Sequence, residues 1–125
     1  MAPAGVEISV GVVRDANFGP LVIVAAGGTL VELLADRAVA LPPVTRESAT
    51  ALLRSLRTAP LLAGWRGAPP VDIDALADAV VGFSQLAIEL GDHLDAVEAN
   101  PVIASPSGAV AVDALVIPSP SVTPE

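Results

Sequence analysis

The sequence predicts a single α+β domain in which a largely antiparallel sheet carries two helices packed on one face. Three observations predict it. Apolar segments rich in Val and Ile occupy both ends of the chain, two segments with helical periodicity lie between them, and Pro, Gly or Asn bounds most segments. The 125 residues, 53% of them hydrophobic, are enough to bury one real core.

The N-terminal third is predicted to form strands. In residues 6–13 every second position is Val or Ile, which is typical of a half-buried strand. Residues 14–20 contain Asn, Gly and Pro and are predicted to turn the chain, so that residues 21–26 return antiparallel to the first strand. Two more strand segments are predicted, at residues 30–34 and 38–41, before Pro42 and Pro43 end this region.

The middle of the chain is predicted to form two helices. Thr45 is a suitable N-cap for an amphipathic helix over residues 46–58, which Pro60 would stop, and residues 60–70 are expected to form a loop. Asp72 or Asp74 would cap a second helix that ends at Gly91. The apolar face expected for this second helix consists of Leu76, Val80, Phe83, Ala87 and Leu90.

The C-terminal part is predicted to form a β-hairpin. Residues 97–104 and 109–117 are apolar and rich in Val and Ile, and the four residues between them are Ser, Pro, Ser and Gly. If these four form the loop, Ala104 faces Ala109, and Asn100 lies directly opposite Asp113.

This register brings together two candidate metal ligands, Asn100 and Asp113. Glu98 lies two residues before Asn100, so its side chain projects from the same face of the strand. Two carboxylates and an amide oxygen form a hard-oxygen site that suits Mg²⁺, which keeps several waters and takes its remaining ligands from substrate phosphates. The alternatives are a solvated strand face and an Asn-Pro turn, and one extra loop residue would separate the two side chains.

Composition excludes some classes of function. The net charge is −8, and the chain has six arginines and no lysine, so nucleic acid is not an expected partner. No apolar run is long enough to cross a membrane, and no secretory signal is recognisable. The absence of cysteine fits a cytoplasmic protein. Residues 118–125 are rich in Pro and Ser and are expected to be a linker or tail that does not pack.

Three motifs make residues 1–117 resemble a known family. They are E-x-x-x-G-V-x-x-D-x-x-F-G-P beginning at Glu7, GG-x-x-VE beginning at Gly27, and Asn100-Pro101 followed at a hairpin's distance by Asp113. Together they resemble the C-terminal part of the ATP-grasp domain of NDP-forming acyl-CoA synthetases, such as the ADP-forming acetate–CoA ligases. The nucleotide-binding subunit of succinyl-CoA synthetase is similar.

The resemblance implies a domain that helps to clasp Mg²⁺ with ATP or GTP. In that family phosphoryl transfer passes through a phosphohistidine and an acyl phosphate before CoA forms the thioester. The resemblance assigns magnesium binding to Asn100 and Asp113, the pair selected by the hairpin register, and leaves a direct or indirect metal role for Glu98. It places Gly27 and Gly28 near the transferred phosphate, with Glu32 in the same block. An ordinary turn for the glycines and a solvated carboxylate for Glu32 are equally compatible with the sequence.

The family's phosphate-binding lysines and adenine-binding strands precede the matched region. We therefore expect this chain to be part of a larger enzyme, whose other ATP-grasp subdomain and CoA-binding and phosphohistidine domains are its partners, and to be inactive alone. The alternative is a non-catalytic regulatory or interaction module, for example in an acetyltransferase fusion. The single histidine, His93, lies outside the motifs and is expected to be a surface residue at a helix end.

Overall fold

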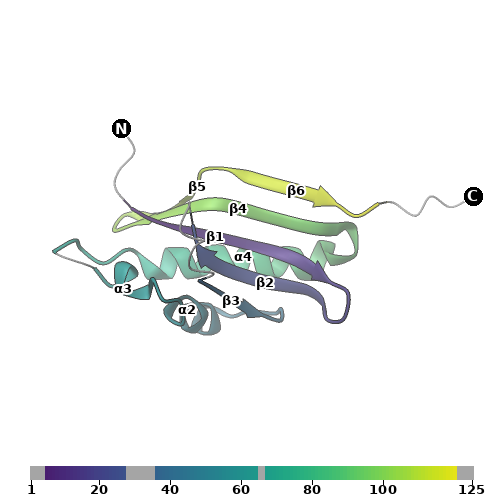
Figure 1. The fold of residues 1–125 in the computed structure, drawn as a ribbon, viewed down its shortest axis with the longest axis horizontal. Helices are drawn as coiled ribbons and strands as arrows, with labels where there is room; N and C mark the ends of the chain where they lie inside the picture. The colour runs from purple at the N-terminus through teal and green to yellow at the C-terminus, as the bar shows by residue number, and fades with distance from the viewer. Residues whose placement is uncertain (1–4, 28–35, 65–66, 121–125) are drawn as a thin grey trace, which may run out of the picture.

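The structure, a computed structural model, describes residues 5–27, 36–64 and 67–120. Six strands form one sheet with the order β3-β2-β1-β4-β5, and β6 pairs with β4 beyond the end of β5 (Figure 1). All pairings are antiparallel. The predicted α+β architecture is therefore confirmed. The elements are β1 (Val6–Asp15), β2 (Gly19–Ala26), β3 (Arg37–Ala40), α2 (Arg46–Arg54), α3 (Ala59–Leu62), α4 (Ile73–Leu90), the 3-10 turn η1 (Gly91–His93), β4 (Leu94–Ser105), β5 (Gly108–Ala111) and β6 (Ala114–Pro118).

The first two strands form the expected antiparallel pair, and they are longer than predicted. Their register runs from Ile8 opposite Ala26 to Asp15 opposite Gly19, so only three residues make the turn. The Asp15 carboxylate accepts the backbone N–H groups of Asn17 and Phe18, at 2.7 and 3.1 Å, and this tightens the connection. The strand predicted at residues 30–34 lies outside the described residues.

The first predicted helix is shorter than expected. Thr45 is the N-cap of α2, as predicted, and it also forms a capping box with Ser48. The helix ends at Arg54 rather than at residue 58, and Pro60 does not stop a helix but lies in the first turn of the short helix α3. Proline is compatible with a first helical turn because the N–H that it lacks would have no partner there.

The second predicted helix is confirmed over Ile73–Leu90. Asp72 is its N-cap and accepts the N–H of Ala75 at 3.0 Å, and Gly91 follows its last residue. Leu90 was predicted to belong to the buried apolar face of this helix, but it is 42% exposed. The buried stripe instead includes Ser84, whose hydroxyl accepts the N–H of Val44 at 2.7 Å. No helix in the part of the chain that the structure describes could span a membrane.

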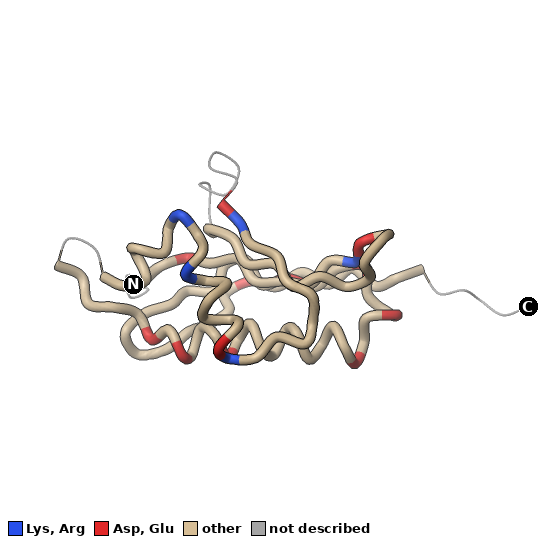
Figure 2. Tube along the Cα trace, turned by 90° about the horizontal axis from the view of Figure 1, so that it is seen from below, with Lys and Arg blue, Asp and Glu red and all other residues tan. Residues whose placement is uncertain are grey.

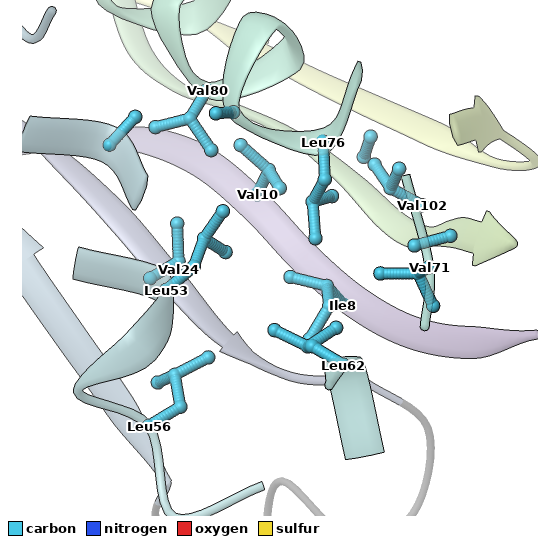
Figure 3. Packing of buried hydrophobic residues seen from close by; sticks show 14 of the residues in the cluster. Ile8, Val10, Val24, Leu53, Leu56, Leu62, Val71, Leu76, Val80 and Val102 are labelled. Carbon is cyan, nitrogen blue, oxygen red and sulfur yellow. The ribbon is translucent and has the colours of Figure 1, made fainter. Parts of the chain in front are cut away.

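The core lies between one face of the sheet and the helices (Figure 3). Leu53 of α2 and Leu76 and Val80 of α4 are fully buried against Ile8 and Val10 of β1. Because neighbouring residues of a strand point to opposite faces, this core leaves Ser9 and its equivalents on the other strands facing away from the helices. We call that second surface of the sheet the open face.

The fold continues into the segment predicted as a tail. Pro118 belongs to β6, where it pairs with Leu94. The N–H of Ser119 donates to the carbonyl oxygen of His93 at 2.9 Å, and its hydroxyl donates to Asp95 at 2.8 Å. Pro118 and Ser119 are therefore held to the sheet by strand pairing and hydrogen bonds, contrary to expectation, and residues 121–125 lie outside the described residues.

Candidate functional site

The predicted hairpin register is confirmed. Ala104 pairs with Ala109 as expected, and further along the ladder the N–H of Asn100 donates to the carbonyl oxygen of Asp113 at 3.0 Å. The connection is tighter than predicted, because Ser105 already pairs with Gly108 and only two residues form the turn. The tighter turn adds no residue to either side, so it leaves the register unchanged.

The second strand of the hairpin is divided, and Asp113 lies in the division. β5 ends at Ala111 and β6 begins at Ala114, yet β6 pairs with β4 in the same register, with Ala99 opposite Ala114. On the other side of β4, the register with β1 shifts between Ile8 and Val10. Both irregularities lie beside Asn100, where the regular pairing of β4 with its neighbouring strands is interrupted.

The three predicted metal ligands lie together on the open face. Ala99 is 1% exposed and belongs to the core, so Glu98 and Asn100, on either side of it, face away from the helices. An open hollow of about 310 Å³ is lined by Glu98, Asn100, Asp113, Ala114 and Leu115. The structure thus brings together the side chains that the sequence selected.

The chemistry of this hollow is that of hard oxygen donors. One oxygen of the Asp113 carboxylate accepts the N–H of Ala114 at 3.0 Å, an interaction that fixes the side chain relative to β6. Among the described residues no three His, Cys, Asp or Glu side chains form a metal cluster, so the protein offers two carboxylates and one amide. Such an incomplete set fits Mg²⁺, which retains waters and shares its coordination with phosphate oxygens.

Gly11 provides the space for Glu98 and was missed in the sequence. It lies directly opposite Glu98, and a Cβ atom at this position would be 2.8 Å from the Glu98 Cβ and 2.8 Å from the Val97 carbonyl oxygen. An isolated glycine inside an apolar strand is the signal that could have indicated this close approach.

We therefore expect Gly11→Ala to displace Glu98 and to destabilise the domain by about 1–3 kcal/mol, the usual cost of overpacking. Gly82→Ala is the matched control, because nothing lies within 4 Å of its added methyl group. Gly82 is inside α4, so this change should instead stabilise by about 0.5–1 kcal/mol. Urea unfolding of both variants checks the prediction, and equal effects would contradict it.

The predicted phosphate-binding residues are only partly described. The N–H of Gly27 donates to the carbonyl oxygen of Glu7 at 2.9 Å, and a Cβ atom at Gly27 would lie 2.9 Å from the Glu7 carbonyl carbon. Gly27 therefore has a packing role, and its N–H is already used within the sheet. Gly28 and Glu32 lie outside the described residues, so phosphate binding by this block stays a prediction. His93 is exposed in η1, as expected.

A buried carboxylate, Asp36, joins the start of β3 to the helix layer. It is 4% exposed and accepts the backbone N–H groups of Arg57 and Thr58 at 2.6 and 2.9 Å. Burial by itself raises the pKa of the Asp36 carboxyl, but these N–H donors hold that pKa below its usual value. The partners are 21 and 22 residues away in sequence, and no local pattern signals the contact.

Comparison with protein families and solved structures agrees with this arrangement of strands and helices. Residues 1–117 match the ATP-grasp domain family. The chain belongs to this family. It is 43% identical over 117 residues to the beta subunit of acetate–CoA ligase (ADP-forming) I of Pyrococcus furiosus, and this match covers 94% of the chain and 50% of that subunit. It is 37% identical over 113 residues to acetate–CoA ligase (ADP-forming) I of Archaeoglobus fulgidus, a match covering 90% of the chain and 16% of that protein.

Solved structures of related proteins contain a domain with the same fold as this chain. The acetyl-coenzyme A synthetase 1 of Candidatus Korarchaeum cryptofilum, solved with coenzyme A and Mg-AMPPCP, is 37% identical and superposes with a TM-score of 0.89. That match covers 95% of the present chain and 55% of the other. The chain thus corresponds to part of the ATP-grasp region of ADP-forming acyl-CoA synthetases, and it spans about half the length of the beta subunits that it resembles.

Proposed function

We propose that this ATP-grasp domain binds a magnesium–nucleotide complex on its open face, as one half of the nucleotide site of an NDP-forming acyl-CoA synthetase. The observation that carries the proposal is the position of Asn100 directly opposite Asp113, with Glu98 in the same hollow. Magnesium, when bound, would neutralise phosphate charge during phosphoryl transfer. The nucleotide is ATP or GTP, and the relative solved with Mg-AMPPCP favours an adenine nucleotide.

The chain's own residues would bind and orient rather than carry a covalent intermediate. The Asp113 carboxylate and the Asn100 amide would supply the metal ligands, and Glu98 would bind the metal directly or through water. The remaining ATP-grasp subdomain and the CoA-binding and phosphohistidine domains would come from the rest of the parent enzyme. A cytoplasmic location is part of the proposal, because the chain contains no cysteine and its chemistry uses nucleotide and CoA.

Calorimetric titration of ATP into the 125-residue chain, with and without Mg²⁺, tests the proposal. We expect ATP to bind only when the metal is present, because the hollow itself contributes negative charge and would repel free triphosphate. Asn100→Ala should weaken the binding of Mg·ATP. Equal ATP affinity with and without Mg²⁺ would contradict the proposed site. If the isolated chain formed ADP from ATP in a reaction that requires both acid and CoA, it would be catalytically complete, and the proposal that it supplies only one half of the nucleotide site would be wrong.

A further inference from the structure

One row of residues crosses the open face from the edge strand β3 to the candidate metal site. Arg37 pairs with Ala25 of β2, and Ala25 pairs with Ser9 of β1. The β1–β4 pairings that flank Ser9 are Ile8 with Val102 and Val10 with Ala99, so Ser9 lies opposite Asn100 and Pro101. The row then ends at Asp113, whose backbone carbonyl oxygen accepts the N–H of Asn100.

The members of this row share the open face. Val24 and Ala38, the neighbours of Ala25 and Arg37, contribute to the core beneath the helices. Residues directly opposite one another on paired strands point the same way, so Arg37, Ala25 and Ser9 face away from that core. Arg37 is exposed and Ser9 is half-buried.

The charges of the chain single out Arg37 on this face. Figure 2 shows the basic residues spaced apart along the chain rather than gathered in one patch. Arg14 donates to the carbonyl oxygens of Gly91 in η1 and Leu94 at the start of β4. The other described arginines lie in or directly after α2: Arg46, Arg54 and Arg57. Within the described ranges, Arg37 is therefore the arginine that shares the open face with the metal site.

The spacing of the row fits a phosphate chain. Adjacent strands lie about 4.8 Å apart, so the Arg37 backbone is about 14 Å from that of Asn100 across two intervening strands. The row members between them, Ala25 and Ser9, have short side chains; Ala25 is 5% exposed and Ser9 is half-buried. The side chain of Arg37 is exposed and long enough to extend from β3 in the direction of the metal site. A guanidinium group is well suited to phosphate oxygens because it donates in a planar, bidentate geometry.

We propose that Arg37 binds the phosphate chain of the nucleotide whose metal is held at Asn100 and Asp113, with the Ser9 hydroxyl lying between the two sites as a further donor. This inference rests on the proposed function. Phosphates usually require cationic side chains in addition to a metal, and the chain has no lysine to supply them. The competing role for Arg37 is protection of an edge strand by a charged side chain, which would be independent of any ligand.

The test compares Arg37→Gln with the control Arg54→Gln in the full 125-residue chain. Mg·tripolyphosphate is the probe, because it carries the phosphate chain without base or ribose, and its affinity is measured by calorimetry. Mn²⁺ alone, followed by electron paramagnetic resonance, reports the metal site separately. We expect Arg37→Gln to weaken Mg·tripolyphosphate binding about tenfold or more while Mn²⁺ affinity stays unchanged. The control should change neither, and the amide spectra should show all three proteins folded.

The outcomes separate this inference from the proposed function. Unchanged Mg·tripolyphosphate affinity in Arg37→Gln, together with Mn²⁺ binding that is lost in Asp113→Asn, would overturn the role of Arg37 and leave the metal site standing. A loss of equal size in Arg37→Gln and Arg54→Gln would also overturn it, because it would reflect net charge alone. Absence of Mn²⁺ binding by the unmodified chain would overturn the proposed function and this inference with it.

Discussion

Asp113→Asn is expected to weaken Mn²⁺ or Mg²⁺ binding by at least about tenfold, since even residues that only support metal ligands contribute about 10–100-fold to affinity. The change removes a charge and keeps the shape of the side chain. The Asn oxygen can still accept the N–H of Ala114, so the junction between β5 and β6 should stay intact. Titration of Mn²⁺ followed by electron paramagnetic resonance measures the effect.

Asp74→Asn is the matched control for this experiment. Asp74 is exposed in the first turn of α4, within the helix layer, and the substitution changes net charge by the same amount. A reduction in Mn²⁺ affinity of similar size in both variants would mean that the metal senses only the overall negative charge of the protein. We expect the loss of Mn²⁺ affinity to be specific to Asp113.

Asp36→Ala is expected to have the largest effect on stability, about 2–6 kcal/mol. The substitution removes a buried carboxylate that accepts two part-buried N–H groups, at Arg57 and Thr58, and each such group left without a partner costs about 1–3 kcal/mol. Asp15→Ala is a suitable control, because its carboxylate also accepts two backbone N–H groups but does so in an exposed turn, where water can replace it. Urea unfolding of both variants measures the difference, and equal losses would contradict the role of burial.

The contribution of Asp36 should also depend on pH in a defined direction. Its pKa is lower in the folded protein than the ordinary value of 3.8, so the folded state favours the charged form. The stabilisation is therefore complete above the unfolded pKa and is lost as pH falls through the folded pKa. We expect the difference in unfolding free energy between the wild type and Asp36→Asn to narrow as pH is lowered below about 4. A difference that stays constant over this range would contradict the assignment.

The sequence was sufficient to predict the candidate metal site because local information determines it. A short turn of Pro106 and Ser107 between two segments rich in Val and Ile sets the register, and the register alone places Asn100 opposite Asp113. The helix caps also depend on local sequence: Thr45 is confirmed, and of the two candidates Asp72 and Asp74 the structure selects Asp72. Where adjacent residues decide the structure, the expectation and the structure agree.

The features that the sequence did not reveal depend on contacts between distant segments. The end of α2 is an example. The apolar periodicity continues to Leu56, but Asp36, just before β3, accepts the N–H groups of the residues that follow the helix. The row from Arg37 to Asn100 requires the registers of three strand pairs, and none of them except the β1–β2 hairpin was predictable from a turn. The interruption between β5 and β6 has no glycine or proline to signal it.

The most direct test of the central claim is to locate the metal on the protein. Mn²⁺, a paramagnetic substitute for Mg²⁺, is added with ATP to the isotopically labelled chain, and amide signals are followed by NMR. We predict broadening centred on Glu98, Asn100 and Asp113 that disappears in Asp113→Ala and persists in Asp74→Asn. Broadening spread over the acidic surface and unchanged by Asp113→Ala would contradict it, and would favour a domain that retains the fold but serves as a non-catalytic module.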